Sequence, residues 1–283
     1  MNTQWGIAAL IIFAMGACVG SFVNVLAYRL PREISIVTPR SFCPHCRRAI
    51  PWWSNLPIVA YLGLRGRCHA CAGAIPFRYF LTELALAAAA AYLFLNFSPL
   101  DALARFVFCA GLFAIALIDY DWRVIPNIIT FPGIPLGFMA AWLMIPEVGW
   151  KSSLAGIALG AGFLFVTGEL YVLIRGAEGV GMGDVWLLGM AGAFLGWTGA
   201  IFTLFFGALL GTFGGIALAL GGEAHGQPEE QVPAAIAEIT GGISSDAPES
   251  LLKTAVPFGP FLALAAATFA LFQPELARWY LLH

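Results

Sequence analysis

Two aspartates, Asp119 and Asp184, stand at the edges of apolar stretches, and each lies in a distinctive local sequence. Asp184 ends the run Gly179-Val180-Gly181-Met182-Gly183-Asp184, whereas Asp119 closes an apolar stretch and is followed closely by Asp121. Carboxylates at membrane depth are costly, so they are seldom retained without a role. If the two meet, one can hold a proton while the other takes a proton from water, and the resulting hydroxide can attack a peptide carbonyl. This pairing is the chemistry of an aspartyl protease.

Each aspartate also has a structural explanation. Asp184 could cap the amino terminus of a helix, because its carboxylate would accept hydrogen bonds from free backbone N–H groups. Asp119 and Asp121 could be interfacial charges beside Arg123. The glycine run favours the protease, because it allows a close approach of the backbone to a substrate strand. The sequence contains no Gly-x-Ser-x-Gly or His-Glu-x-x-His motif, so neither a serine triad nor a catalytic zinc is indicated.

Four cysteines form a second group with chemical potential. Two Cys-x-x-Cys pairs, Cys43 with Cys46 and Cys68 with Cys71, are typical of a tetrahedral zinc site made of four thiolates. A shell of four thiolates leaves no open position, so the zinc is expected to be structural. Its role would be to fold an insert of about 50 residues that is too small for a large core of its own.

The elements that must position these residues are predicted to be membrane helices. The chain has 283 residues, of which 60% are hydrophobic and 11% charged, and its mean hydropathy is +0.84. A soluble domain would carry about 25% charged residues. The apolar stretches predict an all-α polytopic membrane protein with about eight transmembrane helices. They cover roughly residues 5–28, 79–97, 100–119, 127–146, 152–174, 184–198, 200–221 and 255–274.

The distribution of positive charge predicts the orientation. No lysine or arginine precedes Arg29, which argues against a cleavable signal peptide and for a retained first helix. Eight of the 14 basic residues then follow within 50 positions: Arg29, Arg32, Arg40, Arg47, Arg48, Arg65, Arg67 and Arg78. The positive-inside rule therefore places the amino terminus outside and the basic insert in the cytoplasm. Tracing the spans from there brings both aspartates to the cytoplasmic face.

We expect three parts: residues 1–28 as the first transmembrane helix, 29–78 as a cytoplasmic zinc-binding insert, and 79–283 as the membrane core. A loop at about 222–254 is rich in Gly, Pro, Ser and acidic residues, which predicts flexibility. Glycines at spacings of four, such as Gly156 and Gly160, predict close helix packing. The net charge of −2 gives no indication of a nucleic-acid partner.

An ordered set of motifs resembles one known family, the type IV prepilin peptidases, which are bifunctional membrane enzymes of bacteria. The similar segments extend over nearly the whole chain: Gly20-Ser21-Phe22-Val23-Asn24, the paired Cys-x-x-Cys insert, Arg78-Tyr79, Glu83, Leu117-Ile118-Asp119, Ile125-Pro126-Asn127, Glu178–Asp184 and Val256-Pro257-Phe258-Gly259-Pro260-Phe261-Leu262. Such a set is far more specific than a lone Gly-x-Gly-Asp motif.

The resemblance implies a catalytic pair of Asp119 and Asp184, with Asp119 preferred over Asp121 because it lies seven residues before Pro126. It also implies a location in the bacterial inner membrane. The substrate would be the short basic leader of a type IV prepilin or pseudopilin, cleaved after a glycine on the cytoplasmic face. The family then methylates the new amino terminus with S-adenosylmethionine, but no glycine-rich dinucleotide-type motif marks a site for this donor.

Some features depart from the family pattern or remain open. Trp186 stands where the family usually has lysine, and the acidic loop is longer than the resemblance leads us to expect. This loop is either a tolerated insertion or a surface that attracts basic leaders. Glu83 and Glu169 are either structural or receive the amine of the substrate. The alternative functions are a membrane transporter, with the acids as proton relays, or a non-catalytic assembly scaffold with a zinc docking module. The oligomeric state is not indicated.

Overall fold

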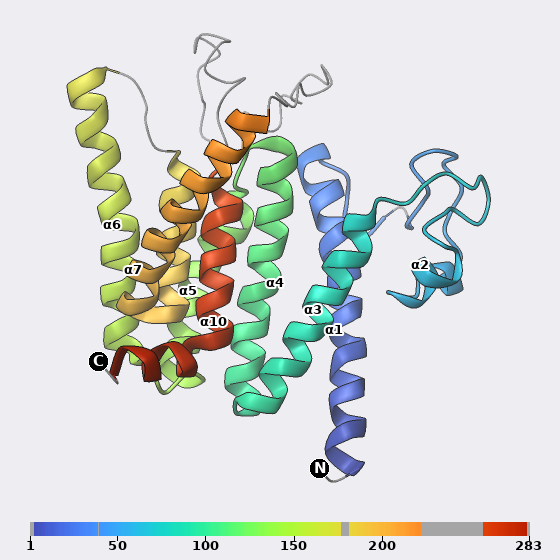
Figure 1. Cartoon of the computed structure of the whole chain (residues 1–283), viewed down its shortest axis with the longest axis horizontal. Coiled ribbons are helices and arrows are strands. Elements are labelled where there is room, and N and C mark those ends of the chain that lie inside the picture. Colours follow the sequence, from blue (N-terminus) through green and yellow to red (C-terminus); the bar gives the residue numbers. More distant parts are fainter. Residues whose placement is uncertain (1–2, 39, 177–180, 222–256, 282–283) are drawn as a thin grey trace. The chain divides into compact units, whose positions relative to one another are not determined.

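The computed structural model describes residues 3–38, 40–176, 181–221 and 257–281, and its regular structure there is helical apart from two isolated β-bridges (Figure 1). The motif residues Glu178, Gly179, Val180 and Val256 and the loop at 222–254 therefore lie outside the described residues. The helices are α1 (Thr3–Arg29), α2 (Val59–Gly63), α3 (Phe77–Asn96), α4 (Pro99–Trp122), α5 (Asn127–Leu143), α6 (Gly149–Arg175), α7 (Met182–Gly221) and α10 (Gly259–Leu281), with two 3-10 turns, η1 (Leu30–Arg32) and η2 (Trp52–Asn55).

The fold is that of a membrane protein. Five of the described helices are long and apolar enough to cross a bilayer: Gly6–Arg32, Phe77–Asn96, Pro99–Trp122, Gly149–Arg175 and Met182–Ile216. The apolar helices at Asn127–Leu143 and Gly259–Gln273 are shorter. Two of the predicted spans, 184–198 and 200–221, fall on α7, whose backbone leaves the helical conformation at Gly196 (φ 74°, ψ −175°). The all-helical class is confirmed, whereas the number of eight spans stays a prediction.

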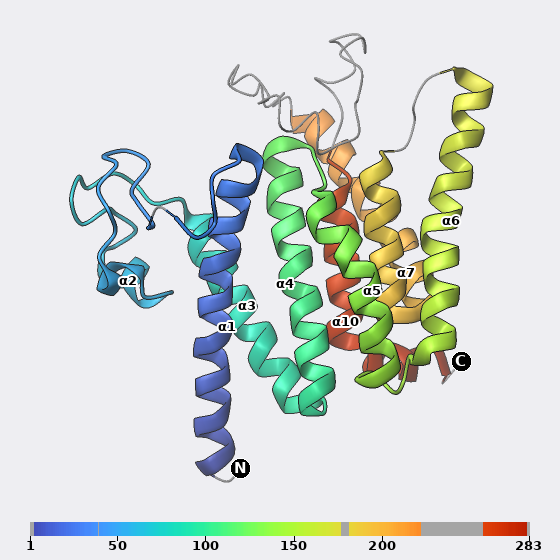
Figure 2. The ribbon, with the colours of Figure 1, turned by 180° about the vertical axis from the view of Figure 1, so that it is seen from behind.

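The chain forms two compact units, Met1–Ala114 and Ile115–His283, whose boundary falls within α4. In the first unit, α1 packs against α3, and both views show the two helices side by side (Figures 1 and 2). A methyl group added at Gly20 would lie 2.7 Å from the Cα atom of Glu83, and one at Gly16 would lie 2.7 Å from the Cβ atom of Ala90. Small residues spaced by four therefore let these helices touch backbone to backbone.

In the second unit, α7 is the central element and packs against α5, α6 and α10. The predicted close approach at Gly156 and Gly160 is confirmed, because both contact the backbone of α7, at Gly192 and Leu188 respectively. Ser153 adds a hydrogen bond of 2.7 Å from its hydroxyl to the carbonyl oxygen of Ala193. This packing holds the first half of α7, and with it Asp184, in a fixed place.

Candidate active site and metal centre

Asp119 lies near the end of α4, in the second unit, and is buried with 5% of its surface exposed. The backbone N–H of Gly259, at the start of α10, donates a hydrogen bond to its carboxylate. The Oδ2 atom of Asp119 has no hydrogen-bond partner among the described residues. One carboxylate oxygen is therefore buried and free to act on a bound group.

Asp184 lies in the first turn of α7, two residues after the helix begins at Met182. Its backbone N–H donates to the carbonyl oxygen of Gly181, at 3.1 Å. Its side-chain Oδ1 atom is buried and, within the described part of the chain, accepts no hydrogen bond. Because a capping carboxylate would bond to free N–H groups, the structure does not support a cap as the role of this oxygen.

The two aspartates belong to the same unit, and their carboxyl groups are close enough to interact electrostatically. Glycines stand next to both acids, Gly259 in space beside Asp119 and Gly183 in sequence before Asp184. A methyl group added at Gly259 would lie 2.6 Å from Oδ2 of Asp119 and 3.1 Å from Ile125, and one at Gly183 would lie 2.8 Å from Ile125. Ile125 therefore packs closely against both Gly259 and Gly183. A side chain at either glycine would clash with Ile125.

Neighbouring residues that sequence analysis singled out take other places. Asp121 is half-buried near the end of α4 and engages in contacts of its own. The indole ring of Trp186 packs edge-on against Phe131 of α5, with ring centroids 5.0 Å apart. At the position where the resemblance led us to expect a lysine, this chain therefore has an apolar contact between α7 and α5. Gly259 belongs to the Val256–Leu262 motif of the sequence, but only the structure shows that it contacts Asp119.

The four cysteines of the insert come together in the first unit. The sulfur atoms of Cys43, Cys46, Cys68 and Cys71 all lie within 4.8 Å of one another. The Cys43 and Cys71 sulfurs are 3.9 Å apart, whereas a tetrahedron with Zn–S bonds of 2.3 Å has edges of about 3.8 Å. A hydrogen bond from the backbone N–H of Ala70 lowers the pKa of the Cys68 thiol to about 7. The donor set and its spacing fit a zinc ion with four thiolate ligands.

The two cysteine pairs sit in equivalent turns 25 positions apart. The N–H groups of Arg47 and Ala72 donate to the carbonyls of Cys43 and Cys68, and both residues have a left-handed backbone (φ 57° and 56°). Equivalent bridges join Phe42 with Ala49 and Arg67 with Ala74. The sequence carries this repetition as Cys-x-x-Cys-x-x-Ala-Ile-Pro, at Cys43–Pro51 and Cys68–Pro76. The cysteine spacing alone predicts the ligands but not this repeat, which is marked in the sequence by the shared Ala-Ile-Pro.

Comparisons with known proteins agree with the site. Residues 14–97 match the Bacterial Peptidase A24 N-terminal domain, and residues 106–216 match the Type IV leader peptidase family. Proteins called prepilin leader peptidase/N-methyltransferase are similar over most of the chain. The protein from Burkholderia pseudomallei strain K96243 is 34% identical, covering 89% of this chain and 82% of its own. The one from Pseudomonas aeruginosa PAO1 is 32% identical (94% and 91%), and the one from Myxococcus xanthus DK1622 is 30% identical (95% and 92%).

No solved structure gives a significant match. The relatives cover nearly the whole chain, and the two matched family regions contain both the four cysteines and the two aspartates. On this evidence the chain belongs to the family of prepilin leader peptidase/N-methyltransferases.

Proposed function

We propose that this protein removes the leader peptide of type IV prepilins or pseudopilins and methylates the new amino terminus, with Asp119 and Asp184 as the catalytic pair of the peptidase. The observation that supports the pair is the presence of two buried carboxylate oxygens without partners, Oδ2 of Asp119 and Oδ1 of Asp184, in groups whose charges interact. Buried polar atoms are normally satisfied, so orphaned ones at one site indicate a missing ligand.

The reaction follows from sharing one proton between two carboxyl groups. Two nearby carboxylates resist being ionised together, so one is a base while the other is an acid. The base removes a proton from water, and the hydroxide attacks the scissile carbonyl; the acid donates its proton to the developing oxyanion. The hydrogen bond from Gly259 orients the carboxylate of Asp119. A glycine before the scissile bond would fit a close approach at Gly181, which is exposed and where an added methyl group would meet only the carboxylate of Asp184, at 3.4 Å.

The protein would act at the cytoplasmic face of the inner membrane, with its amino terminus outside. The basic residues that follow the first helix, from Arg29 to Arg78, support this orientation. The enzyme would bind and cleave the leader of the substrate on that face, while the hydrophobic stem of the substrate remains in the bilayer. The scaffold and transporter alternatives lack support, because the similar proteins are named as enzymes.

The metal centre would hold Zn²⁺ through Cys43, Cys46, Cys68 and Cys71. Four thiolates fill a tetrahedral shell, so the ion would bind no water and would serve to fold the insert. The peptidase chemistry proposed for the two aspartates then uses no metal-bound water.

The catalytic pair is tested with Asp119→Asn and Asp184→Asn. Each purified protein is incubated in detergent with a prepilin, and the products are weighed by mass spectrometry. We expect cleavage to fall by at least about 10²- to 10⁴-fold in both variants, the range typical of a lost general acid or base. Asp121→Asn is the matched control and should cleave normally.

Folding is checked by gel filtration and by zinc content, neither of which should change. Normal cleavage by either Asp119→Asn or Asp184→Asn would remove that residue from the mechanism. Loss of cleavage in Asp121→Asn with normal cleavage in Asp119→Asn would transfer the role of the first acid to Asp121.

A further inference from the structure

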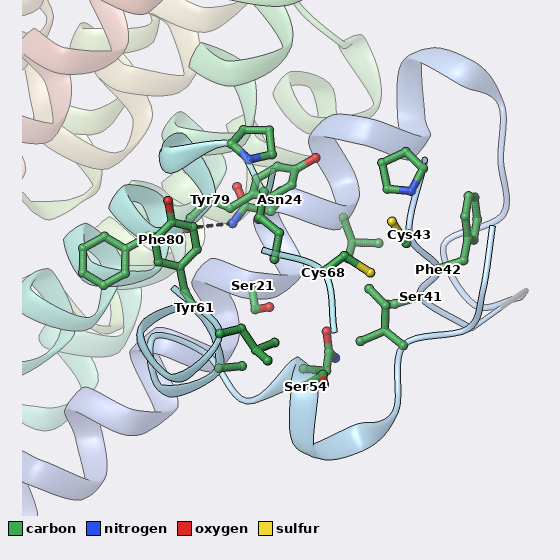
Figure 3. Close-up of a pocket in the computed structure, with 18 of the residues that line it drawn as sticks. Ser21, Asn24, Ser41, Phe42, Cys43, Ser54, Tyr61, Cys68, Tyr79 and Phe80 are labelled. Atoms are coloured by element: carbon green, nitrogen blue, oxygen red, sulfur yellow. Dashed lines mark hydrogen bonds between the residues drawn. The ribbon is translucent and has the colours of Figure 1, made fainter. Parts of the chain in front are cut away.

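The first unit contains a cavity of about 200 Å³ between the insert and the ends of α1 and α3 that adjoin it (Figure 3). Helix α1 contributes Ser21 and Asn24 to its wall, α3 contributes Tyr79 and Glu83, and the insert contributes Ser54 and Tyr61. Cys43 and Cys68 also line it, and Figure 3 shows their sulfur atoms beside it. The peptidase mechanism uses none of these residues.

Among the described residues that line the cavity, Glu83 is the only acidic one. It is buried, with 9% of its surface exposed, and its carboxylate accepts hydrogen bonds from the backbone N–H of Ile58, at 2.7 Å, and from the hydroxyl of Ser21. Within the described ranges no lysine or arginine forms a salt bridge with it. Arg29 is on the same wall but donates to the carbonyl oxygen of Ser35, at 2.6 Å. A buried carboxylate without a cation is costly, so its retention favours a cationic ligand.

The backbone that faces Glu83 is held in a strained conformation. Ile58 has φ 63° and ψ −54°, and the N–H of Val59 reaches back to the carbonyl of Pro57 in a tight three-residue turn. A β-branched residue rarely adopts positive φ, and such strain persists where the surroundings impose it, often at functional sites. The hydrogen bond from Ile58 to Glu83 fixes the insert to α3 and directs this carboxylate.

Other wall atoms are left without partners. Asn24, with 7% of its surface exposed, donates through Nδ2 to the carbonyl oxygen of Tyr79, while its Oδ1 and the Oγ of Ser54 are buried and unbonded in the described structure. Tyr61 and Phe80 add a stacked aromatic surface, with ring centroids 5.2 Å apart. The cavity thus offers hydrogen-bonding atoms, flat apolar walls and one acidic side chain.

We propose that this cavity binds S-adenosylmethionine, with Glu83 facing the cationic aminoacyl-sulfonium end of the molecule. The hydroxyl and amine groups of the nucleoside can donate hydrogen bonds to the unbonded oxygens of Asn24 and Ser54. The purine ring can pack against the aromatic surface of Tyr61 and Phe80. The inference rests on the proposed methyltransferase activity and assigns it a site. In the transfer, the lone pair of the substrate amine forms a bond to the methyl carbon as the carbon–sulfur bond breaks, leaving S-adenosylhomocysteine and releasing one proton from the amine.

Glu169, the other acid that the sequence left open, has a different environment. It lies on α6 in the second unit and is exposed. It borders no part of the cavity. Glu169 is therefore a matched control for Glu83, since both are glutamates in apolar helices.

The experiment measures the binding of S-adenosylmethionine and S-adenosylhomocysteine to the full-length protein in detergent by calorimetry. Glu83→Gln keeps an acceptor for the Ile58 N–H but removes the charge, and should weaken S-adenosylmethionine binding about 10- to 100-fold. Asn24→Ala should weaken both ligands, and Glu169→Gln should weaken neither. Ultraviolet cross-linking of methyl-labelled S-adenosylmethionine should mark peptides within residues 21–83.

Unchanged binding in Glu83→Gln, or cross-links only outside residues 21–83, would overturn the proposal. If Glu83→Gln binds both ligands normally yet no longer methylates a cleaved pilin, the carboxylate receives the substrate amine and the proposal is wrong. Prepilin cleavage by Glu83→Gln should stay normal, which shows that the variant is folded. Asp184→Asn should retain ligand binding, so failure of the peptidase assignment is distinguished from failure of this one.

Discussion

Gly259 shows how a residue without a side chain sets the geometry of a carboxylate. Its N–H donates to Asp119, and the space where a Cβ would stand is 2.6 Å from Oδ2 of that residue. The same space is 3.1 Å from the Cδ1 atom of Ile125, which also packs beside Gly183. A side chain here would therefore displace Asp119, the turn at the start of α10, or both.

We expect Gly259→Ala to lower the rate of prepilin cleavage about 10- to 100-fold while the protein remains folded, because a small displacement of a catalytic group is costly. The measurement is kcat for a prepilin in detergent. Gly162→Ala is the control, since a methyl group there meets nothing within 4 Å. Cleavage at the normal rate in Gly259→Ala would show that the close contact does not position Asp119.

At the scale of elements, the crossing of α1 and α3 joins the first helix to the cavity. Gly20 lies against Glu83, and one turn further along α1 Asn24 bonds to the carbonyl of Tyr79, one turn before Glu83 on α3. A single row of residues on α1 thus both packs the helices and forms the cavity wall. This explains why Gly20 and Asn24 occur at a spacing of four.

We expect Gly20→Ala to destabilise the protein by about 1–3 kcal/mol, the usual cost of adding a methyl group to a filled contact. The added Cβ would lie 2.7 Å from the Cα atom of Glu83, so one helix must move. The midpoint of thermal unfolding in detergent measures the effect. Gly6→Ala on the same helix has open space around it and should leave the midpoint unchanged or slightly raised.

The order of the helices could be predicted from sequence better than their contacts. Apolar runs of about 20 residues located every described long helix, because bilayer thickness fixes their length. The sequence did not reveal that Gly16, Gly20 and Asn24 of α1 contact α3. Which helices pack together depends on contacts between residues far apart in the chain. The buried ion pair of Asp101 with Arg105, at 2.6 Å, was likewise not anticipated, since spacing by four residues does not reveal burial.

The same limit applies to the candidate site. The types and spacing of the cysteines were sufficient to predict a cluster, because metal ligation demands both. The glycine run before Asp184 predicted a catalytic role for this residue. Only the three-dimensional structure shows that its Oδ1 atom has no hydrogen-bond partner among the described residues and that Gly259 donates to Asp119. The cavity around Glu83 was invisible in sequence because its wall combines α1, the insert and α3.

At the scale of the whole molecule, the chain divides its chemistry between two compact units. The cysteine cluster and the cavity belong to Met1–Ala114, whereas both aspartates belong to Ile115–His283. Because each unit has its own packing, damage to one need not abolish the chemistry of the other. Cleavage and methyl-donor binding should therefore be separable.

We expect removal of zinc by a strong chelator to abolish binding of S-adenosylmethionine and to leave prepilin cleavage detectable at reduced efficiency. The reason is that Cys43 and Cys68 line the cavity, while the aspartates lie in the other unit. Calorimetry and mass spectrometry are run on the same samples, with metal content measured in parallel and zinc added back as the control. Complete loss of cleavage that zinc restores would instead give the metal a part in proteolysis.

The two equivalent turns of the insert have a consequence for how the metal site is completed. Each Cys-x-x-Cys-x-x-Ala-Ile-Pro segment supplies two sulfur ligands, half of what a tetrahedral ion requires. An ion held by all four sulfurs would therefore join two similar segments of one chain, in the way that a shared ion can join two separate chains. Two copies of the motif, 25 positions apart, supply the complete ligand set without a second molecule.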